Sequence, residues 1–266
     1  MTMTFSLHES IGPDGAVGKI EQAGFNSKPT LGAAGDRFPI LREKLRIPAT
    51  GDLVERPRID ALLEKSRAQF PATLVSGRSG TGKTSLAARF ARGVENVSWY
   101  SVEATDIEWP VFARYFTAAL RETGRAMAIR EGENGAENVT EAEIARFLLR
   151  AFSTTQPAAD EPSLIVLDDI HHLFDAPWFG DFFNLLLYSL PPETHLLLLC
   201  RSRPPGPLWR LRSKQMLNVL DEKVIAFTIT ETQSLFASLD KASSGTERAH
   251  RDSFGRVSRL LQFVAD

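Results

Sequence analysis

The sequence of 266 residues contains a single cysteine, Cys200. One thiol cannot form a disulfide within the chain, and this scarcity is typical of proteins from reducing compartments. The apolar runs are also short, and the run at 196–200 is far below the roughly 20 residues that cross a bilayer. The first residues lack the basic segment followed by an apolar stretch that marks a secretory signal. These absences predict a cytoplasmic protein.

Neither sign of charge is in excess, since 31 Lys and Arg residues stand against 33 Asp and Glu residues. A surface that binds nucleic acid needs clustered positive charge, so this balance predicts no direct nucleic-acid binding by the chain. Hydrophobic residues make up 43% and charged residues 24%, which is ordinary for a globular protein. The length is enough to bury a sizeable core in one large domain or slightly more.

What the sequence does contain is a glycine-rich segment, residues 77–84, which reads GRSGTGKT and fits the pattern G-x-x-x-x-G-K-[ST]. A short apolar run at 72–76 precedes it, and a helical pattern at 85–91 follows it. This is the strand–loop–helix context of a phosphate-binding loop, and it argues against an ordinary glycine-rich turn. The predicted nucleotide-binding residues of this segment are Gly77, Arg78, Ser79, Gly80, Thr81, Gly82, Lys83, Thr84 and Ser85.

The residue types of this loop predict its chemistry. Glycines have no Cβ, so the backbone can approach phosphate oxygens, and successive N–H groups form a nest for an anion. The helix that begins near Lys83 directs the positive end of its dipole at the same place. Lys83 is predicted to put its ammonium between the β- and γ-phosphates, and the Thr84 hydroxyl is predicted to ligate Mg²⁺.

A second signal lies at residues 163–169, which read SLIVLDD. A continuous apolar run is typical of a central strand in a parallel sheet that is covered on both faces. Carboxylates at the carboxyl end of such a strand lie where open α/β sheets bind ligands. We predict that Asp168 holds Mg²⁺ and that Asp169 orients or polarises the attacking water. A solvated Asp-Asp turn is the alternative, and the upstream phosphate loop makes it the weaker one.

Strand and helix patterns alternate along the chain, which predicts an α/β fold: a parallel P-loop NTPase sheet flanked by helices. We divide the chain into a loosely attached leader (1–45), an ATPase core (46–230) and a short C-terminal helical extension that forms a partial lid (231–266). The predicted strands are 72–76, 97–102, 163–167, 194–200 and 224–230, and the predicted helices are 58–63, 83–92, 109–122, 140–152, 177–190, 208–212, 231–239 and 246–265.

With these elements in this order, the chain resembles the nucleotide-binding module of signal-transduction ATPases with numerous domains (STAND). In particular, it resembles the MalT-like, LuxR-type transcriptional activators. The resemblance covers roughly residues 47–240. It is carried by residues 47–48 (IP), 53–58 (LVERPR), 99–103 (WYSVE), 112–120, 164–173 (LIVLDDIHHL), 197–205 with its paired prolines, and 208–212 (LWRLR).

The resemblance implies roles that spacing does not give. It places Val54 and Arg56 over the adenine, and it makes Arg201, at the end of the fourth strand, the residue that senses the γ-phosphate. A guanidinium can contact phosphate oxygens in two places and lose that contact on hydrolysis. A solvated surface cation is the alternative for Arg201. The catalytic set that follows is Lys83, Asp169 and Arg201.

The chain also departs from the family. Members usually continue into a winged helix, helical repeats and a DNA-binding helix-turn-helix, whereas this chain stops at Asp266. We expect either part of a larger regulator or a stand-alone ATPase. In the family, a Gly-x-Pro segment is expected to contact phosphate and to lock ADP in the resting state. The chain reads Gly255-Arg256-Val257 at this place, without the proline, which puts this ADP-locking contact in doubt.

We therefore expect an ATP-binding, Mg²⁺-dependent P-loop module that hydrolyses ATP slowly and acts as a switch in a signalling or transcription-regulatory ATPase. Its expected partners are the nucleotide and, on ATP binding, a protein partner or a second copy of the chain. No association with a membrane is expected. Two other functions stay open. One is a phosphotransferase that acts on a small molecule, with the arginines of 201–214 as its lid. The other is a non-catalytic scaffold that retains ADP.

Overall fold

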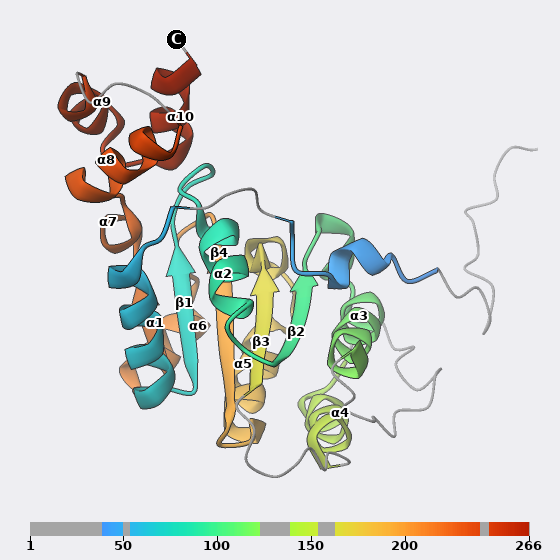
Figure 1. Ribbon diagram of the computed structural model, residues 1–266. Helices are drawn as coiled ribbons and strands as arrows, with labels where there is room; N and C mark the ends of the chain where they lie inside the picture. The colour runs from blue at the N-terminus through green and yellow to red at the C-terminus, as the bar shows by residue number, and fades with distance from the viewer. Residues whose placement is uncertain (1–38, 50–53, 123–138, 154–162, 240–244, 266) are drawn as a thin grey trace, which may run out of the picture. The chain divides into compact units, whose positions relative to one another are not determined.

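The computed structural model of the chain describes residues 39–49, 54–122, 139–153, 163–239 and 245–265. The chain divides into two compact units, Met1–Arg37 and Phe38–Asp266, and all described residues belong to the second. This unit contains a five-stranded sheet in the order β2-β3-β4-β1-β5, in which all neighbouring strands are parallel (Figure 1). The predicted α/β fold, a parallel sheet flanked by helices, is confirmed.

The parallel arrangement decides where chemistry can gather. The strands are β1 (Ala72–Ser76), β2 (Asn96–Ser101), β3 (Ser163–Asp168), β4 (Thr194–Cys200) and β5 (Leu217–Leu220). Because parallel strands end at the same edge of the sheet, the segments that follow β1, β3 and β4 meet there.

Helices cover both faces of the sheet, and the residues of β3 alternate between them. Leu164 and Val166 pack with α1 (Pro57–Gln69) and α2 (Lys83–Ala91). Ile165 and Leu167 belong to the larger cluster on the other face. That face is covered by α3 (Trp109–Glu122), α4 (Glu141–Ser153), α5 (Phe179–Ser189) and α6 (Gly206–Ser213). The continuous apolar run of β3 therefore reflects burial on two sides.

The described residues after β5 form four helices: α7 (Glu222–Ile225), α8 (Ile229–Ser238), α9 (Thr246–Ser253) and α10 (Val257–Ala265). In Figure 1 they follow one another in orange and red. The last three share a small apolar cluster of their own, which includes Phe227, Leu235, Phe236, Ala249 and Leu260.

Two sequence predictions about this segment are wrong. The strand predicted at 224–230 is instead the end of α7 and the start of α8, because the Asp221 and Thr228 side chains cap these two helices. The fifth strand is β5, which lies seven residues earlier than predicted at its first residue (217 against 224). The single helix predicted at 246–265 is divided into α9 and α10, because Phe254 and Gly255 both have positive φ, at 54° and 69°.

Three short turns of 3₁₀-helix connect these elements: η1 (Arg42–Leu45), η2 (Ala104–Ile107) and η3 (Ile170–Leu173). Residues 1–38 of the predicted leader, residues 123–138 between two of the predicted helices, and residue 266 lie outside the described residues. The last part of the leader is packed, since Leu45 joins the large core cluster and Lys44 Nζ lies 2.8 Å from Asp106 Oδ1. The domain boundaries at 45 and 230 stay predictions.

Candidate nucleotide-binding site

The backbone of the phosphate-binding loop adopts conformations that favour glycine. Gly80 and Gly82 have φ of 77° and 83°, and Gly82 is the N-cap of α2. Gly77 has a different requirement, because a Cβ there would lie 3.1 Å from Thr81 Oγ1 and 3.4 Å from Glu222 Cβ. The loop thus delivers Lys83, the first residue of α2, to the carboxyl edge of the sheet.

Lys83 lies folded into the loop that precedes it. Its Nζ donates to the carbonyl oxygen of Arg78 over 3.1 Å, and Thr81 Oγ1 donates to the same oxygen over 2.9 Å. Burial lowers the pKa of Lys83, and the nearby carboxylates of Asp169 and Asp168 oppose this effect. The result is a buried ammonium with one carbonyl partner, which an anion entering the loop could engage. Ser79 is exposed, and Ser85 is half-buried in the first turn of α2.

The structure brings Thr84 and Asp168 into direct contact. Thr84 Oγ1 donates to Asp168 Oδ2 over 2.8 Å, and the backbone N–H of Asp169 donates to Asp168 Oδ1 over 2.8 Å. Burial and the adjacent Asp169 charge raise the pKa of Asp168 to about 6. A buried carboxylate beside a hydroxyl fits a hard cation such as Mg²⁺, because the cation would stabilise the charged form that burial disfavours.

Asp169 is held by Arg201. The guanidinium donates from Nε to Oδ1 over 2.9 Å and from Nη2 to Oδ2 over 2.6 Å, which is a bidentate pair. Asp169 itself has φ of 55°, in the left-handed region. His171, for which the sequence predicts no role, places Nδ1 3.7 Å from Asp169 Oδ1. Asp169, Arg201 and the end of β3 therefore form one cluster. It joins the carboxylate predicted to orient water to the arginine predicted to sense the γ-phosphate.

The side chains of Val54 and Arg56 contact the C-terminal segment of the chain. The Arg56 side chain is engaged by protein, since Nη2 donates to the carbonyl oxygens of Ile225 and Ala226 over 2.8 and 3.1 Å. Val54 packs against the small apolar cluster of the C-terminal helices. The adenine-binding role of Val54 and Arg56 stays a prediction, and the contacts of Arg56 give its guanidinium a structural role.

The C-terminal helices contact the phosphate-binding loop. The sequence did not predict which residues make this contact. The N–H of Ser258 in α10 donates to the Gly80 carbonyl over 3.0 Å, and a Cβ on Gly82 would lie 3.2 Å from Val257. Residues 255–257 lack the expected proline. Gly255 and Arg256 directly precede α10, and Val257 is its first residue.

A charged bridge reinforces this contact. Glu222 accepts from the backbone N–H of Arg78 over 3.2 Å and from its Nη2 over 2.9 Å. Arg256 Nε donates to the same carboxylate over 2.9 Å. Glu222 thereby joins the loop to the residue before α10. No local signal predicts this bridge, because its three residues are far apart in the sequence.

Residues 55–199, more than half of the chain, match the family of AAA ATPase domains. The chain belongs to this family. The chain is 29% identical over 179 residues to the HTH-type transcriptional regulator MalT of Serratia proteamaculans, an alignment that covers 66% of this chain and 20% of the relative. It is 28% identical over 184 residues to MalT of Cronobacter sakazakii, which covers 69% and 20%. The chain thus spans about a fifth of the length of these relatives.

Solved structures agree in fold. The chain is similar to a STAND protein with a tetratricopeptide repeat sensor from Pyrococcus horikoshii, with a TM-score of 0.58, 18% identity and coverage of 86% of this chain and 32% of that one. A Walker-type ATPase of Pyrococcus abyssi gives a TM-score of 0.51, 13% identity and coverage of 80% and 67%. The resemblance to a MalT-like P-loop module is confirmed. In the part of the chain that the structure describes, no helix could span a membrane.

Proposed function

We propose that the chain is an ATP-binding and slowly hydrolysing P-loop switch module of a signalling or transcription-regulatory ATPase. The observation that carries the proposal is the contact between Thr84 and Asp168, which joins the phosphate-binding loop to the acidic end of β3. The membership in the AAA ATPase family and the likeness to MalT regulators support it. We expect the module to act in the cytoplasm.

Each residue of the cluster has a distinct part in this proposal. The N–H groups of the loop and the Lys83 ammonium would bind the phosphates and offset their charge. Thr84 and Asp168 would hold Mg²⁺, which supplies further charge stabilisation at the phosphate oxygens when it is bound. Asp169 would orient the attacking water. In the described geometry its carboxylate is paired with Arg201, so this role requires the pair to open.

The pair between Asp169 and Arg201 supports slow, regulated turnover. The γ-phosphate of ATP would offer Arg201 oxygens that compete with those of Asp169, and the pair could form again after hydrolysis. ATP and ADP would then favour different arrangements of the cluster, which is what a switch requires. The contact of α10 with Gly80 gives the C-terminal helices a direct way to respond. A protein partner or a second copy would bind one of the two arrangements.

Product analysis with γ-labelled ATP and Mg²⁺ tests the proposal. We expect slow release of labelled phosphate. Transfer of the label to a small molecule would instead support a phosphotransferase. Retention of ADP through purification, without any phosphate release, would support a scaffold that binds nucleotide and does not hydrolyse it.

A further inference from the structure

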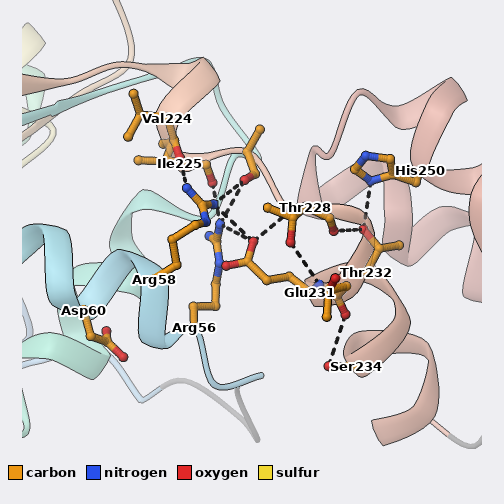
Figure 2. Close-up of polar contacts among 12 residues, drawn as sticks. Arg56, Arg58, Asp60, Val224, Ile225, Thr228, Glu231, Thr232, Ser234 and His250 are labelled. Carbon is orange, nitrogen blue, oxygen red and sulfur yellow. Dashed lines mark hydrogen bonds and ion pairs between the residues drawn. The ribbon is translucent and has the colours of Figure 1, made fainter.

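Two arginines at the start of α1 hold the connection between α7 and α8. Figure 2 shows Arg56 and Arg58 reaching toward the carbonyl groups of this connection and toward Glu231 of α8. Arg58 donates to the carbonyl oxygens of Val224 and Ala226 over 2.8 and 2.9 Å. Together with the Arg56 contacts already described, the two guanidiniums bind three consecutive carbonyl groups. We call Arg56, Arg58 and Glu231 the arginine clamp.

Glu231 is the shared member of the arginine clamp. Its Oε2 accepts from Arg56 over 3.0 Å, from Arg58 over 3.2 Å and from the backbone N–H of Thr228 over 2.9 Å. The last bond is half of a capping box, because the Thr228 hydroxyl accepts from the Glu231 N–H in return. One carboxylate therefore fixes the first turn of α8 and forms ion pairs with two arginines at the start of α1.

The clamp connects on one side to the helix that carries Lys83. Arg89 of α2 donates from Nη2 to the Arg56 carbonyl over 3.2 Å, and the same nitrogen is bonded to the Asp60 carboxylate of α1. Movement of α2 relative to α1 would therefore disturb the backbone of Arg56. This gives the phosphate-binding helix a hydrogen-bonded connection to the clamp.

On the other side the clamp connects to α9. Thr232, one residue after Glu231, donates from Oγ1 to the Thr228 carbonyl over 2.8 Å and lies 3.0 Å from His250 Nδ1 (Figure 2). Arg56 also stacks on Phe227, with its guanidinium carbon 4.1 Å from the ring centroid. Phe227 belongs to the apolar cluster shared by the C-terminal helices, so the clamp is anchored in that cluster.

Breaking the arginine clamp is unfavourable in free energy because two of its groups are buried. Arg56 is 5% exposed and Glu231 is 8% exposed. Removing one charge of a buried pair leaves the other without a partner in a poorly solvated place, which is strongly unfavourable. The C-terminal helices can thus move as a body relative to α1 only if these contacts open or move with them.

We propose that the arginine clamp is a positioning device that couples the phosphate-binding helix α2 to the C-terminal helices, with Glu231 as its central residue. This inference rests on the proposed function, because coupling to a nucleotide requires that the chain binds one. The coupling acts through groups of α1, α7 and α8, in addition to the direct contact of α10 with the loop.

Hydrogen–deuterium exchange of the full chain, with and without saturating Mg²⁺ and ADP, tests this coupling. The variant is Glu231→Gln, which keeps the size and a carbonyl acceptor for Thr228 but removes the charge. The matched control is Glu247→Gln, because Glu247 is exposed on α9. In the wild type and the control we expect ADP to slow exchange in residues 77–84 and in α8, the latter by about fivefold or more, the lower end of coupling between sites.

In Glu231→Gln we expect ADP still to protect residues 77–84, while the protection of α8 falls well below its wild-type value, because only the direct contact of α10 with the loop then connects the two. A purely structural role would lower the melting temperature and leave the ADP-dependent change in α8 intact, which would overturn the inference. Protection of residues 77–84 without any response of α8 in the wild type would also overturn it and leave the proposed function standing. No protection of residues 77–84 would overturn both.

A second variant covers the case in which Glu231→Gln does not fold. Arg58→Gln removes one donor to Glu231 and leaves Arg56 in place, and the Arg58 side chain is 40% exposed. We expect the ADP-dependent protection of α8 to fall to about half of its wild-type value, within the usual range for one member of a coupled network. An unchanged response in a folded Arg58→Gln protein would contradict the coupling.

Discussion

The backbone N–H of Ser258 donates to the carbonyl oxygen of Gly80, so the first turn of α10 lies against the phosphate-binding loop. A Cβ added to Gly80 would lie 2.2 Å from Ser258 Oγ and 2.6 Å from its Cβ. The loop and α10 therefore pack so closely at Gly80 that a side chain at this position would collide with Ser258. Any nucleotide-dependent shift of the loop must be accommodated by α10.

Gly80→Ala tests this fit. We expect the substitution to lower the free energy of unfolding by about 1 to 3 kcal/mol, because it adds a collision to a positive φ. The double variant Gly80→Ala with Ser258→Gly should lose less than the sum of the two single variants, since Ser258→Gly removes the colliding atoms while costing α10 itself up to about 1 kcal/mol. Urea unfolding measures all three. Losses that simply add in the double variant would mean that α10 yields without cost.

Lys83→Ala should abolish nucleotide binding without unfolding the chain. The side chain makes one hydrogen bond to the Arg78 carbonyl and is desolvated, so its loss costs the fold little. We expect the Kd for ATP to rise by about 100-fold or more, which corresponds to about 2.7 kcal/mol. Titration calorimetry measures this, and circular dichroism confirms the fold. Unchanged affinity would refute the role of Lys83.

Asp168 predicts a pH dependence. Its pKa is raised from 3.8 to about 6 in the folded chain, so the folded state holds this proton more tightly than the unfolded state does. The free energy of unfolding contributed by Asp168 should therefore fall as the pH rises from about 4 to about 6 and stay low above that. Asp168→Asn should be more stable than the wild type at pH 7.5 by about 2 to 3 kcal/mol.

Because Mg²⁺ needs the ionised carboxylate, the gain in nucleotide affinity from Mg²⁺ should weaken below about pH 6. Asp168→Asn should lose both the gain and its pH dependence. Measurement of the Kd for ADP with Mg²⁺ and with EDTA, at pH 5.5 and 7.5, checks this. A Mg²⁺ effect in Asp168→Asn equal to that of the wild type would place the cation elsewhere.

Asp169→Asn should retain ATP but stall its hydrolysis. The amide keeps a partner for Arg201 but cannot orient water as a carboxylate does, and the ion pair it replaces involves a half-exposed Arg201 that contributes little stability. We expect phosphate release to fall by about 100-fold or more, the range for removal of a group that acts in proton transfer. Normal turnover at saturating ATP would assign the water-orienting role to another residue.

The parts of the site that are local in sequence could be predicted, and the parts that depend on distant residues could not. The loop at 77–84 and the acids after β3 carry their own patterns, and the parallel sheet brings them together. By contrast, 175 residues separate Arg56 from Glu231, and 34 separate Glu222 from Arg256. A single sequence contains no signal for such pairs.

The wrong strand at 224–230 has a physical reason of the same kind. Its composition of β-branched and aromatic residues favours a strand. The two caps at Asp221 and Thr228, and the two guanidiniums that bind the carbonyls of 224–226, favour helices joined by a turn. The true edge strand β5 has only four residues, too few for a periodic pattern to identify it.

Cys200 gives this chain a practical advantage for following its C-terminal helices. It is the only cysteine of the sequence, its side chain is fully buried, and burial raises the pKa of its thiol. Alkylating dyes react with thiolates that solvent can reach, so they should leave Cys200 unmodified while the protein is folded. A single cysteine introduced at Leu261, which is 44% exposed on α10, would therefore take up one label at a known place. Fluorescence from that position could report movement of the helix in the natural sequence background, without first removing a native thiol.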